Sequence, residues 1–194
     1  MRSSDEELLA GLRRGSRTAY RHLLREHGGR LLAVATRIAG DPESGRDALQ
    51  EALLLVVRRI DTFEGRSSLS TWLHRIVVNQ ALSIRRRRAR RAELPIEPLL
   101  PSFDEAGKRV PSVHPSEPQR APEELVSSRE VREQVREAIE RLPERYRVVL
   151  LLRDIQDIPT KDVAEILELT ENNVRVRLHR ARAALKALLE PMML

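Results

Sequence analysis

Polar side chains that can contact DNA follow one another closely after Thr170. Amide groups pair well with adenine edges and guanidinium groups with guanine edges. Major-groove readers place such groups near the start of a recognition helix. A solvated helix face is the alternative interpretation, since basic amphipathic helices are common. The residues concerned are Asn172, Asn173, Arg175, Arg177, His179, Arg180 and Arg182.

Two short helices that meet at a tight turn are predicted to carry these groups. Thr170 is a good N-cap for the second helix, because its hydroxyl can accept a free backbone N–H, and Glu171 sits where the helix dipole favours an acid. A small residue at Ala164 lets the two helices cross closely, as in a helix-turn-helix. Apolar residues recur at helical spacing before the turn, at Val163, Ala164 and Leu167, and after it, at Val174, Leu178, Ala181 and Leu185.

A second basic feature is the run from Arg85 to Arg91, in which every residue except Ala89 is arginine. Guanidinium groups on every side of a helix end cannot face an apolar core. The helix that leads into the run begins near Ser70 and carries Trp72, the single tryptophan. Arginine beside a stacking surface favours contact with nucleic-acid phosphates and bases, and a plain solvated tail is the alternative.

Three polar residues share one side of an otherwise apolar helix that starts at Asp41 and Pro42. There an acid suits the N-cap and proline suits the first helical position. Asp47, Gln50 and Glu51 are spaced so that they lie on one side of this helix. This side is either an exposed helix face or a docking face for a partner protein.

Catalytic and metal-binding patterns are absent from the sequence. The five histidines include no i, i+4 metal pair, and the chain has no cysteine. Residues 67–70 lack the Gly-x-Ser-x-Gly frame of a hydrolase, and there is no glycine-rich phosphate loop. We therefore expect no enzyme, no bound metal and no cofactor.

Composition favours an ordinary soluble protein with a polyanionic partner. The 194 residues are 41% hydrophobic and 33% charged, with a net charge of +6. Residues 1–92 hold 19 Lys and Arg against 10 Asp and Glu, which predicts strongly salt-dependent binding to a polyanion. No apolar run approaches the roughly 18 residues of a membrane span, and no signal core follows Met1. We expect a cytoplasmic protein without membrane insertion.

Proline marks a boundary between two helical halves. Seven of the eleven prolines lie between residues 93 and 122, where the composition predicts a flexible linker. Apolar residues on both sides recur at helical spacing, without strand-like alternation. We predict an all-α protein with two small helical domains, 1–92 and 123–194, joined by a Pro-rich linker over 93–122. The C-terminal domain holds the helix-turn-helix.

Two groups of residues together resemble bacterial RNA polymerase sigma factors of the sigma-70 family, extracytoplasmic-function subfamily. The likeness to their fourth region extends from Leu142 to Arg182. The likeness to their second region rests on the run Asp47-Ala48-Leu49-Gln50-Glu51-Ala52-Leu53, on Phe63, Gly65, Ser70-Thr71-Trp72-Leu73-His74-Arg75-Ile76 and Asn79, and on the arginine run.

The resemblance implies a dissociable subunit that recognises promoters, helps to melt the DNA and starts transcription. It implies core RNA polymerase as a partner, at the clamp of the largest subunit and the flap of the second largest, together with promoter DNA. It also admits an anti-sigma factor, and we expect a monomer when the chain is free. The residues that it assigns to docking on the polymerase are Asp47, Gln50 and Glu51.

The resemblance also assigns two DNA surfaces. One captures a flipped base of the −10 element, which needs a pocket with polar edges and arginines that grip the backbone. Its residues are Phe63, Gly65, Arg66, Ser67, Ser68, Trp72, Arg75, Asn79, Arg85 and Arg86. The other reads the −35 element with Thr170, Glu171, Asn172, Asn173, Arg175, Val176, Arg177, His179 and Arg180. The chain departs from the family at Glu168, where glycine is usual, and at Asn173, where threonine is common.

Two other functions fit parts of the sequence. A conventional helix-turn-helix regulator would bind duplex operator without polymerase, but the basic N-terminal half lacks a glycine- and strand-rich ligand fold. A peripheral membrane or scaffold protein would use the helix around Trp72 and its arginines to hold an anionic surface. Liposome binding without polymerase binding would support that second alternative.

Overall fold

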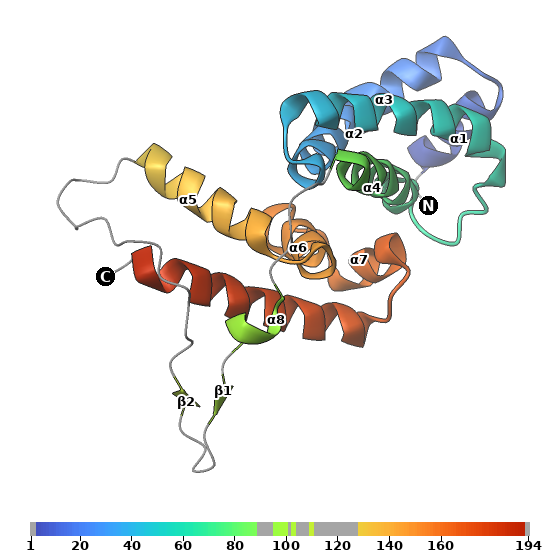
Figure 1. Ribbon diagram of the computed structural model, residues 1–194. Coiled ribbons are helices and arrows are strands. Elements are labelled where there is room, and N and C mark those ends of the chain that lie inside the picture. Colours follow the sequence, from blue (N-terminus) through green and yellow to red (C-terminus); the bar gives the residue numbers. More distant parts are fainter. Residues whose placement is uncertain (1–2, 89–94, 101, 104–108, 111–127, 193–194) are drawn as a thin grey trace. The chain divides into compact units, whose positions relative to one another are not determined.

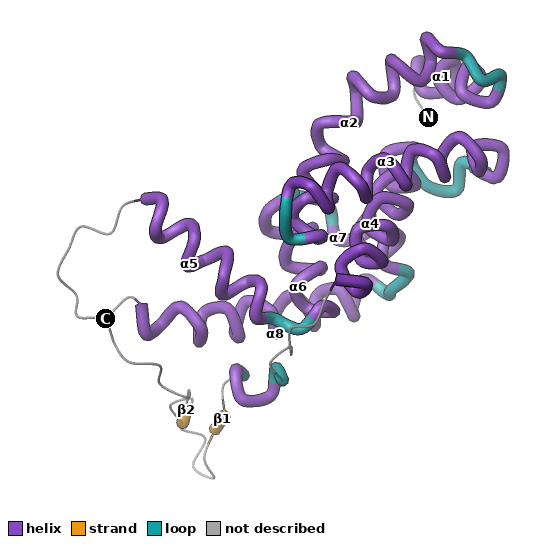
Figure 2. The backbone as a smooth tube through the Cα atoms, turned by 45° about the horizontal axis from the view of Figure 1, so that its top comes forward, coloured by secondary structure: helices purple, strands orange, loops and turns teal. Residues whose placement is uncertain are grey.

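The predicted all-α architecture is confirmed, with one small addition of strand. The computed structural model describes residues 3–88, 95–100, 102–103, 109–110 and 128–192. Helices make up nearly all of the described elements (Figure 1, Figure 2). The chain divides into two compact units, of which the first contains Met1–Arg90 and Leu151–Glu171, and the second Arg91–Leu150 and Asn172–Leu194.

Three long helices form the core of the first unit. They are α2 (Arg17–Ala39), α3 (Pro42–Arg59) and α4 (Leu69–Arg88), each packed against the other two, with α1 (Ser3–Arg13) against α2. A 3-10 turn, Ile60–Thr62, follows α3 and packs against it and α1. Aliphatic side chains fill the space between the helices, among them Leu23, Leu31, Val34, Ile38, Ala48, Ala52, Val56, Leu73, Val77 and Ala81.

The start of α3 is fixed in the way the sequence predicts. Asp41 is the N-cap, and its Oδ1 accepts the amide hydrogen of Ser44 at 2.8 Å, with Pro42 in the first turn. Close approach to α2 requires glycine at position 45, because a Cβ there would lie 2.6 Å from Cα of Thr36. The N-terminal end of α3 is therefore held both by its cap and by backbone contact with α2.

The first unit also includes a C-terminal segment. A π-helical turn, Leu151–Ile155, packs against α2, and α7 (Thr160–Leu167) packs against α4. The left-handed residue that ends α7 is Glu168, with φ of 55°. Glycine is the residue that adopts this conformation at least cost. Glu168 thus takes the backbone conformation that explains why glycine is usual at this point.

The second unit contains α5 (Ser128–Arg141), α6 (Glu144–Leu150) and α8 (Glu171–Leu189). The apolar stripe of α8 is buried, at Val174, Leu178, Ala181, Ala184, Ala187 and Leu188. A buried arginine links α5 to α6: Nη1 of Arg147 donates to the backbone oxygens of Glu140 at 2.9 Å and Leu142 at 2.8 Å. This guanidinium satisfies carbonyl groups that the end of α5 leaves without helical partners.

The described part of the segment predicted as a linker contains short secondary-structure elements. A 3-10 turn, Glu97–Leu99, comes before two antiparallel strands, β1 (Ser102–Phe103) and β2 (Arg109–Val110). Ile96 and Leu99 are buried. These two apolar residues therefore have packing partners, which the proline count alone did not indicate.

None of the described helices combines the length and the apolar composition needed to cross a bilayer.

Candidate docking groove and nucleic-acid surfaces

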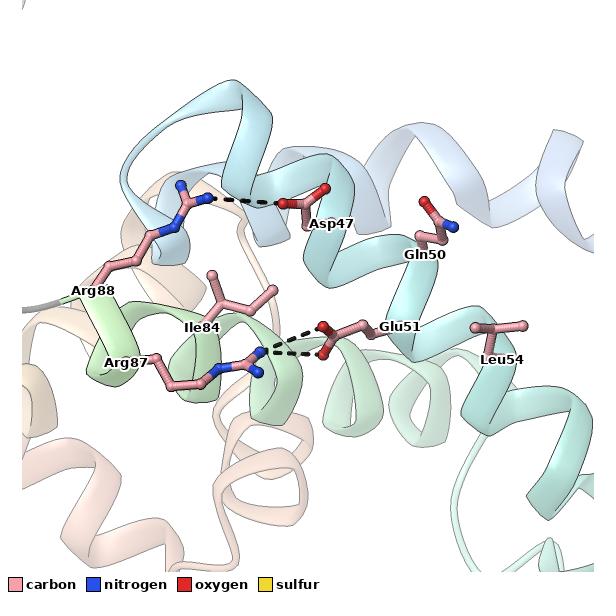
Figure 3. Close-up of a pocket in the computed structure, with 7 residues that line it drawn as sticks. All are labelled: Asp47, Gln50, Glu51, Leu54, Ile84, Arg87 and Arg88. Atoms are coloured by element: carbon pink, nitrogen blue, oxygen red, sulfur yellow. Dashed lines mark hydrogen bonds and ion pairs between the residues drawn. The ribbon is translucent and has the colours of Figure 1, made fainter.

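The three polar residues predicted to dock a partner line one groove between α3 and α4. The groove has a volume of about 360 Å³. Helical spacing brings Asp47, Gln50 and Glu51 to the same side of α3. Leu54 extends this side by one turn, and α4 closes the groove with Ile84, Arg87 and Arg88 (Figure 3).

Two arginines of α4 meet the carboxylates in this groove. Arg87 Nη2 lies 3.4 Å from both carboxylate oxygens of Glu51, and Arg88 Nη2 lies 3.9 Å from Oδ2 of Asp47 (Figure 3). All four side chains are about half exposed. Exposed pairs of this length stabilise a fold by only about 0–1 kcal/mol each. The groove therefore presents acids whose intramolecular partners hold them weakly.

Arg88 also reaches the cap of α3. Its Nη1 lies 3.6 Å from Oδ2 of Asp41 and donates to Oγ of Ser44, which in turn donates to Oδ2 of Asp41 at 2.6 Å. The Ser44 hydroxyl and amide, with Arg88 as a smaller cause, lower the pKa of Asp41. One guanidinium thus connects the N-cap of α3 with Asp47, a docking residue.

A second pocket collects part of the predicted −10 surface. Its volume is about 470 Å³. Phe63 and Trp72 are buried at its side, with ring centroids 5.4 Å apart and planes inclined by 54°. The loop between them turns at Gly65, with φ of 74°. Nη2 of Arg13 in α1 donates a hydrogen bond to the carbonyl oxygen of Phe63 at 2.8 Å. The lining consists of Thr62, Phe63, Glu64, Gly65, Arg66, Ser67, Thr71, Trp72, Arg75 and Glu165.

Both aromatic and charged groups border this pocket. Arg66 pairs with Glu64 at 2.6 Å, and Arg75 lies 3.9 Å from a carboxylate oxygen of Glu168. A stacking ring beside guanidinium groups is the combination that single-stranded nucleic acid needs. The acids Glu64 and Glu165 were not anticipated, because nothing in their spacing relates them to the aromatic residues.

Four residues predicted for the −10 surface are outside this pocket. Ser68 instead caps α4, since its Oγ accepts the amide hydrogen of Thr71 at 3.0 Å. Arg85 of α4 donates to the carbonyl of Ile38 at 3.2 Å near the end of α2. Asn79 is exposed two turns beyond Trp72, and Arg86 is exposed farther along α4. Residues 89–91 of the arginine run lie outside the described part of the chain.

The histidine within the second-region motif belongs to the core. His74 is buried, and its Nδ1 lies 2.7 Å from the carbonyl oxygen of Ser70, so Nδ1 carries the hydrogen. Burial lowers the pKa of this imidazole, against the opposing effect of that hydrogen bond. Among the described residues no three His, Cys, Asp or Glu side chains lie together in a group that could hold a metal ion.

The predicted −35 surface is a row of exposed side chains on α8 and on the residue just before it. Thr170, Glu171, Asn172, Asn173, Arg175, Val176, His179 and Arg180 are exposed, and Arg177 is partly so. Val176 is 42% exposed among these polar groups, which leaves its methyls available for apolar contact with a base. Of the predicted apolar stripe of α8, Val174, Leu178 and Ala181 are buried and Leu185 is only partly buried. Ala184, Ala187 and Leu188 complete the buried stripe.

Two segments of the chain match conserved regions of known proteins. Residues 23–91 match Sigma-70 region 2, and residues 132–185 match Sigma-70, region 4. Over 186 residues the chain is 32% identical to the ECF RNA polymerase sigma factor SigM of Mycobacterium tuberculosis, covering 96% of this chain and 85% of that protein. It is 28% identical over 192 residues to the RNA polymerase sigma-H factor of Pseudomonas aeruginosa, covering 97% and 95%.

Solved structures share this fold. CnrH, determined in complex with the cytosolic domain of CnrY, superposes with a TM-score of 0.68 at 22% identity, covering 97% of this chain and 98% of that one. The sigma factor RpoE, determined with the anti-sigma factor NepR from Bartonella quintana, gives a TM-score of 0.60 at 22% identity, covering 88% and 96%.

Proposed function

The chain belongs to the sigma-70 family of RNA polymerase sigma factors, in the extracytoplasmic-function group, and on that premise we propose that it directs transcription initiation. It binds core RNA polymerase, recognises promoter DNA and helps to melt it. The polymerase carries out the chemistry of RNA synthesis, and this chain acts as an initiation factor. The observation that carries the proposal is that both DNA-recognition regions of the family occur in order along one chain.

Polymerase docking is assigned to Asp47, Gln50 and Glu51. They share the groove of α3, and their half-exposed carboxylates suit a cationic partner surface. The clamp of the largest polymerase subunit is the partner that we propose for this groove. The flap of the second largest subunit is proposed as a separate contact.

Capture of a −10 base is assigned to the pocket beside Phe63 and Trp72. An unstacked base needs an aromatic surface, polar edges and nearby cations for the phosphates. Trp72, Ser67 and Arg75 provide one of each at this pocket. The exposed groups of α8 are proposed to read the −35 duplex.

The proposed domains are 1–92, 93–122 and 123–194, with the −10 reader in the first and the −35 reader in the last. Joining two modules raises the local concentration of the second once the first is bound, so that weak modules can select a bipartite site. An anti-sigma factor is a further proposed partner. RpoE was determined with the anti-sigma factor NepR, and CnrH with the cytosolic domain of CnrY.

Reconstituted transcription tests this function. The purified chain, added to core RNA polymerase, is expected to yield transcripts from promoters that start mapping identifies after its overexpression. Glu51→Arg is expected to abolish most of this activity by weakening docking. Glu26→Arg on the exposed side of α2 makes the same charge change away from the groove and serves as the control. Duplex binding by the free chain without any binding to core polymerase at low salt would contradict the proposal.

A further inference from the structure

The two arginines in the docking groove create a conflict that the proposed function must resolve. Asp47 and Glu51 are assigned to a cationic partner, yet Arg88 and Arg87 of the same chain already face them. In this groove and at the cap of α3, three carboxylates meet two guanidiniums. A partner cation that enters without displacing these arginines would be repelled by both of them.

The geometry favours displacement. The arginine-to-acid distances of 3.4 and 3.9 Å are long for charge-assisted hydrogen bonds, whose usual length is about 2.7–2.9 Å. The side chains of Arg87 and Arg88 are 62% and 53% exposed, so both can leave their groove acids toward solvent. On leaving, Arg88 also gives up its contacts with Ser44 and Asp41 at the cap of α3. The apolar part of the groove consists of Leu54 and Ile84 (Figure 3).

The position of the pair at the end of α4 gives the displaced groups a second ligand. Arg87 and Arg88 directly follow Arg85 and Arg86, which are assigned to DNA. Arginine binds carboxylates and phosphates through the same planar fork of donors. A guanidinium released from a carboxylate next to DNA therefore meets an equivalent ligand in the phosphate backbone.

We propose that Arg87 and Arg88 are exchangeable counterions of the docking acids. The cationic surface of core RNA polymerase displaces them from Glu51 and Asp47, and the released guanidiniums bind promoter phosphates. Because coupling between two binding sites is reciprocal, phosphate binding by these arginines also exposes the acids and strengthens docking. This inference rests on the proposed function and adds a mechanism by which polymerase binding prepares the chain for DNA.

The affinity for core polymerase tests the first half of the exchange. Full-length Arg87→Gln/Arg88→Gln is expected to bind core polymerase about two- to tenfold more tightly than the unsubstituted chain, because two weak competing pairs are removed. Arg21→Gln/Arg25→Gln on the exposed side of α2 loses the same charge outside the groove and is the control. Surface plasmon resonance at fixed ionic strength measures the affinities. Equal or weaker binding by the groove variant overturns the proposal.

Folding and function are kept separate in this experiment. Arg88 touches the cap of α3, so circular dichroism checks the double variant, and the single Arg87→Gln, which leaves that cap intact, must also bind more tightly. Failure of the unsubstituted chain to bind core polymerase would contradict the proposed function itself. Normal binding by that chain, with no higher affinity in the variants, would contradict only the proposed displacement of Arg87 and Arg88.

A mutant cycle on the free chain tests the second half. Asp47→Asn/Glu51→Gln releases Arg87 from its acid and Arg88 from one of its two acids, while Asp41 still pairs with Arg88. This variant is expected to raise affinity for a mixed-sequence DNA duplex about two- to tenfold. Removal of negative charge alone would raise affinity in any background. The same change made in Arg87→Gln/Arg88→Gln is therefore the decisive comparison, since its gain must be smaller if the released arginines bind phosphate. Equal gains in the two backgrounds overturn this half.

Discussion

The two surfaces assigned to DNA are built in different ways. The pocket at the start of α4 is a hollow whose aromatic rings, Phe63 and Trp72, are buried in the protein. The surface on α8 is a row of exposed side chains above a separate apolar stripe. Duplex DNA provides its own groove, so its reader needs only protruding groups. A base removed from the stack has no groove of its own, and the protein must provide the cavity.

This contrast has a consequence for folding. Residues that form a cavity are also packed against the core, whereas the exposed side chains of α8 lie outside its buried apolar stripe. Substitutions in the pocket are therefore expected to affect stability and DNA binding together. Substitutions on α8 are expected to affect DNA binding alone, and the following predictions test this separation.

Trp72→Ala is the largest expected disruption. Trp72 is 6% exposed and packs on Phe63, so its truncation is expected to destabilise the fold by about 3–5 kcal/mol. Urea unfolding followed by circular dichroism measures this loss. Trp72→Phe keeps an aromatic ring and is expected to lose clearly less. A fully stable Trp72→Ala variant would show that the pocket is not part of the packed core.

Arg177→Ala is expected to leave stability within about 0.5 kcal/mol, because surface substitutions rarely exceed that. Its binding to a −35 duplex is expected to weaken by about 1–3 kcal/mol, the range for a bidentate base contact. Calorimetric titration with duplex DNA gives the loss. Lys186→Ala, on an exposed part of the same helix closer to its C-terminal end, is the matched control.

Asn79→Ala is expected to have the opposite pattern of defects to Arg177→Ala, with DNA melting affected and duplex binding retained. Asn79 is exposed on α4 and assigned to the −10 element. Its loss is expected to slow open-complex formation and to leave binding to a −35 duplex unchanged. The permanganate reactivity of unpaired thymines measures the rate of open-complex formation. Equal defects of both variants in both assays would contradict the assignment of DNA melting to α4 and −35 duplex binding to α8.

The smallest expected effect concerns the cap that positions the docking acids. Asp41→Ala is expected to cost about 1 kcal/mol at neutral pH, because α3 loses its N-cap. The pKa of Asp41 is lowered in the folded state, so its ionised form stabilises the fold above the unfolded pKa. That contribution disappears as the pH falls below about 4 and through the folded pKa.

Chemical denaturation across this pH range measures the Asp41 effect. Asp41→Asn retains a capping oxygen without a titrating group, so its stability is expected to lack the acid-dependent loss at this position. An Asp41→Ala variant with unchanged stability at neutral pH would show that the contact of Gly45 with α2 is enough to hold the start of α3.

Much of the local structure followed from the sequence. The cap at Asp41, the shared side of Asp47 and Glu51 and the buried stripe of α8 each depend on residues within a few positions of one another. Helical periodicity and capping preferences are sufficient to predict such features.

The features that sequence reasoning missed depend on contacts between distant residues. Arg87 and Glu51 are 36 positions apart, and their pairing depends on how α3 packs against α4. Arg147 was not distinguished from the other arginines, because no sequence pattern indicates that its guanidinium would be buried against backbone carbonyl groups. Ser68 did have a local signal, because serine is a preferred N-cap residue and Ser68 directly precedes α4, where its hydroxyl can accept the amide hydrogen of Thr71. The family resemblance assigned Ser68 to DNA instead.

The ring packing of Phe63 and Trp72 also provides a spectroscopic probe. Trp72 is the single tryptophan of the chain, so its indole is the sole source of tryptophan fluorescence in the unlabelled protein. This indole lines the pocket assigned to base capture. A nucleobase stacked against this indole in the pocket is expected to quench its emission. The chain thus carries an intrinsic optical readout of the pocket assigned to base capture.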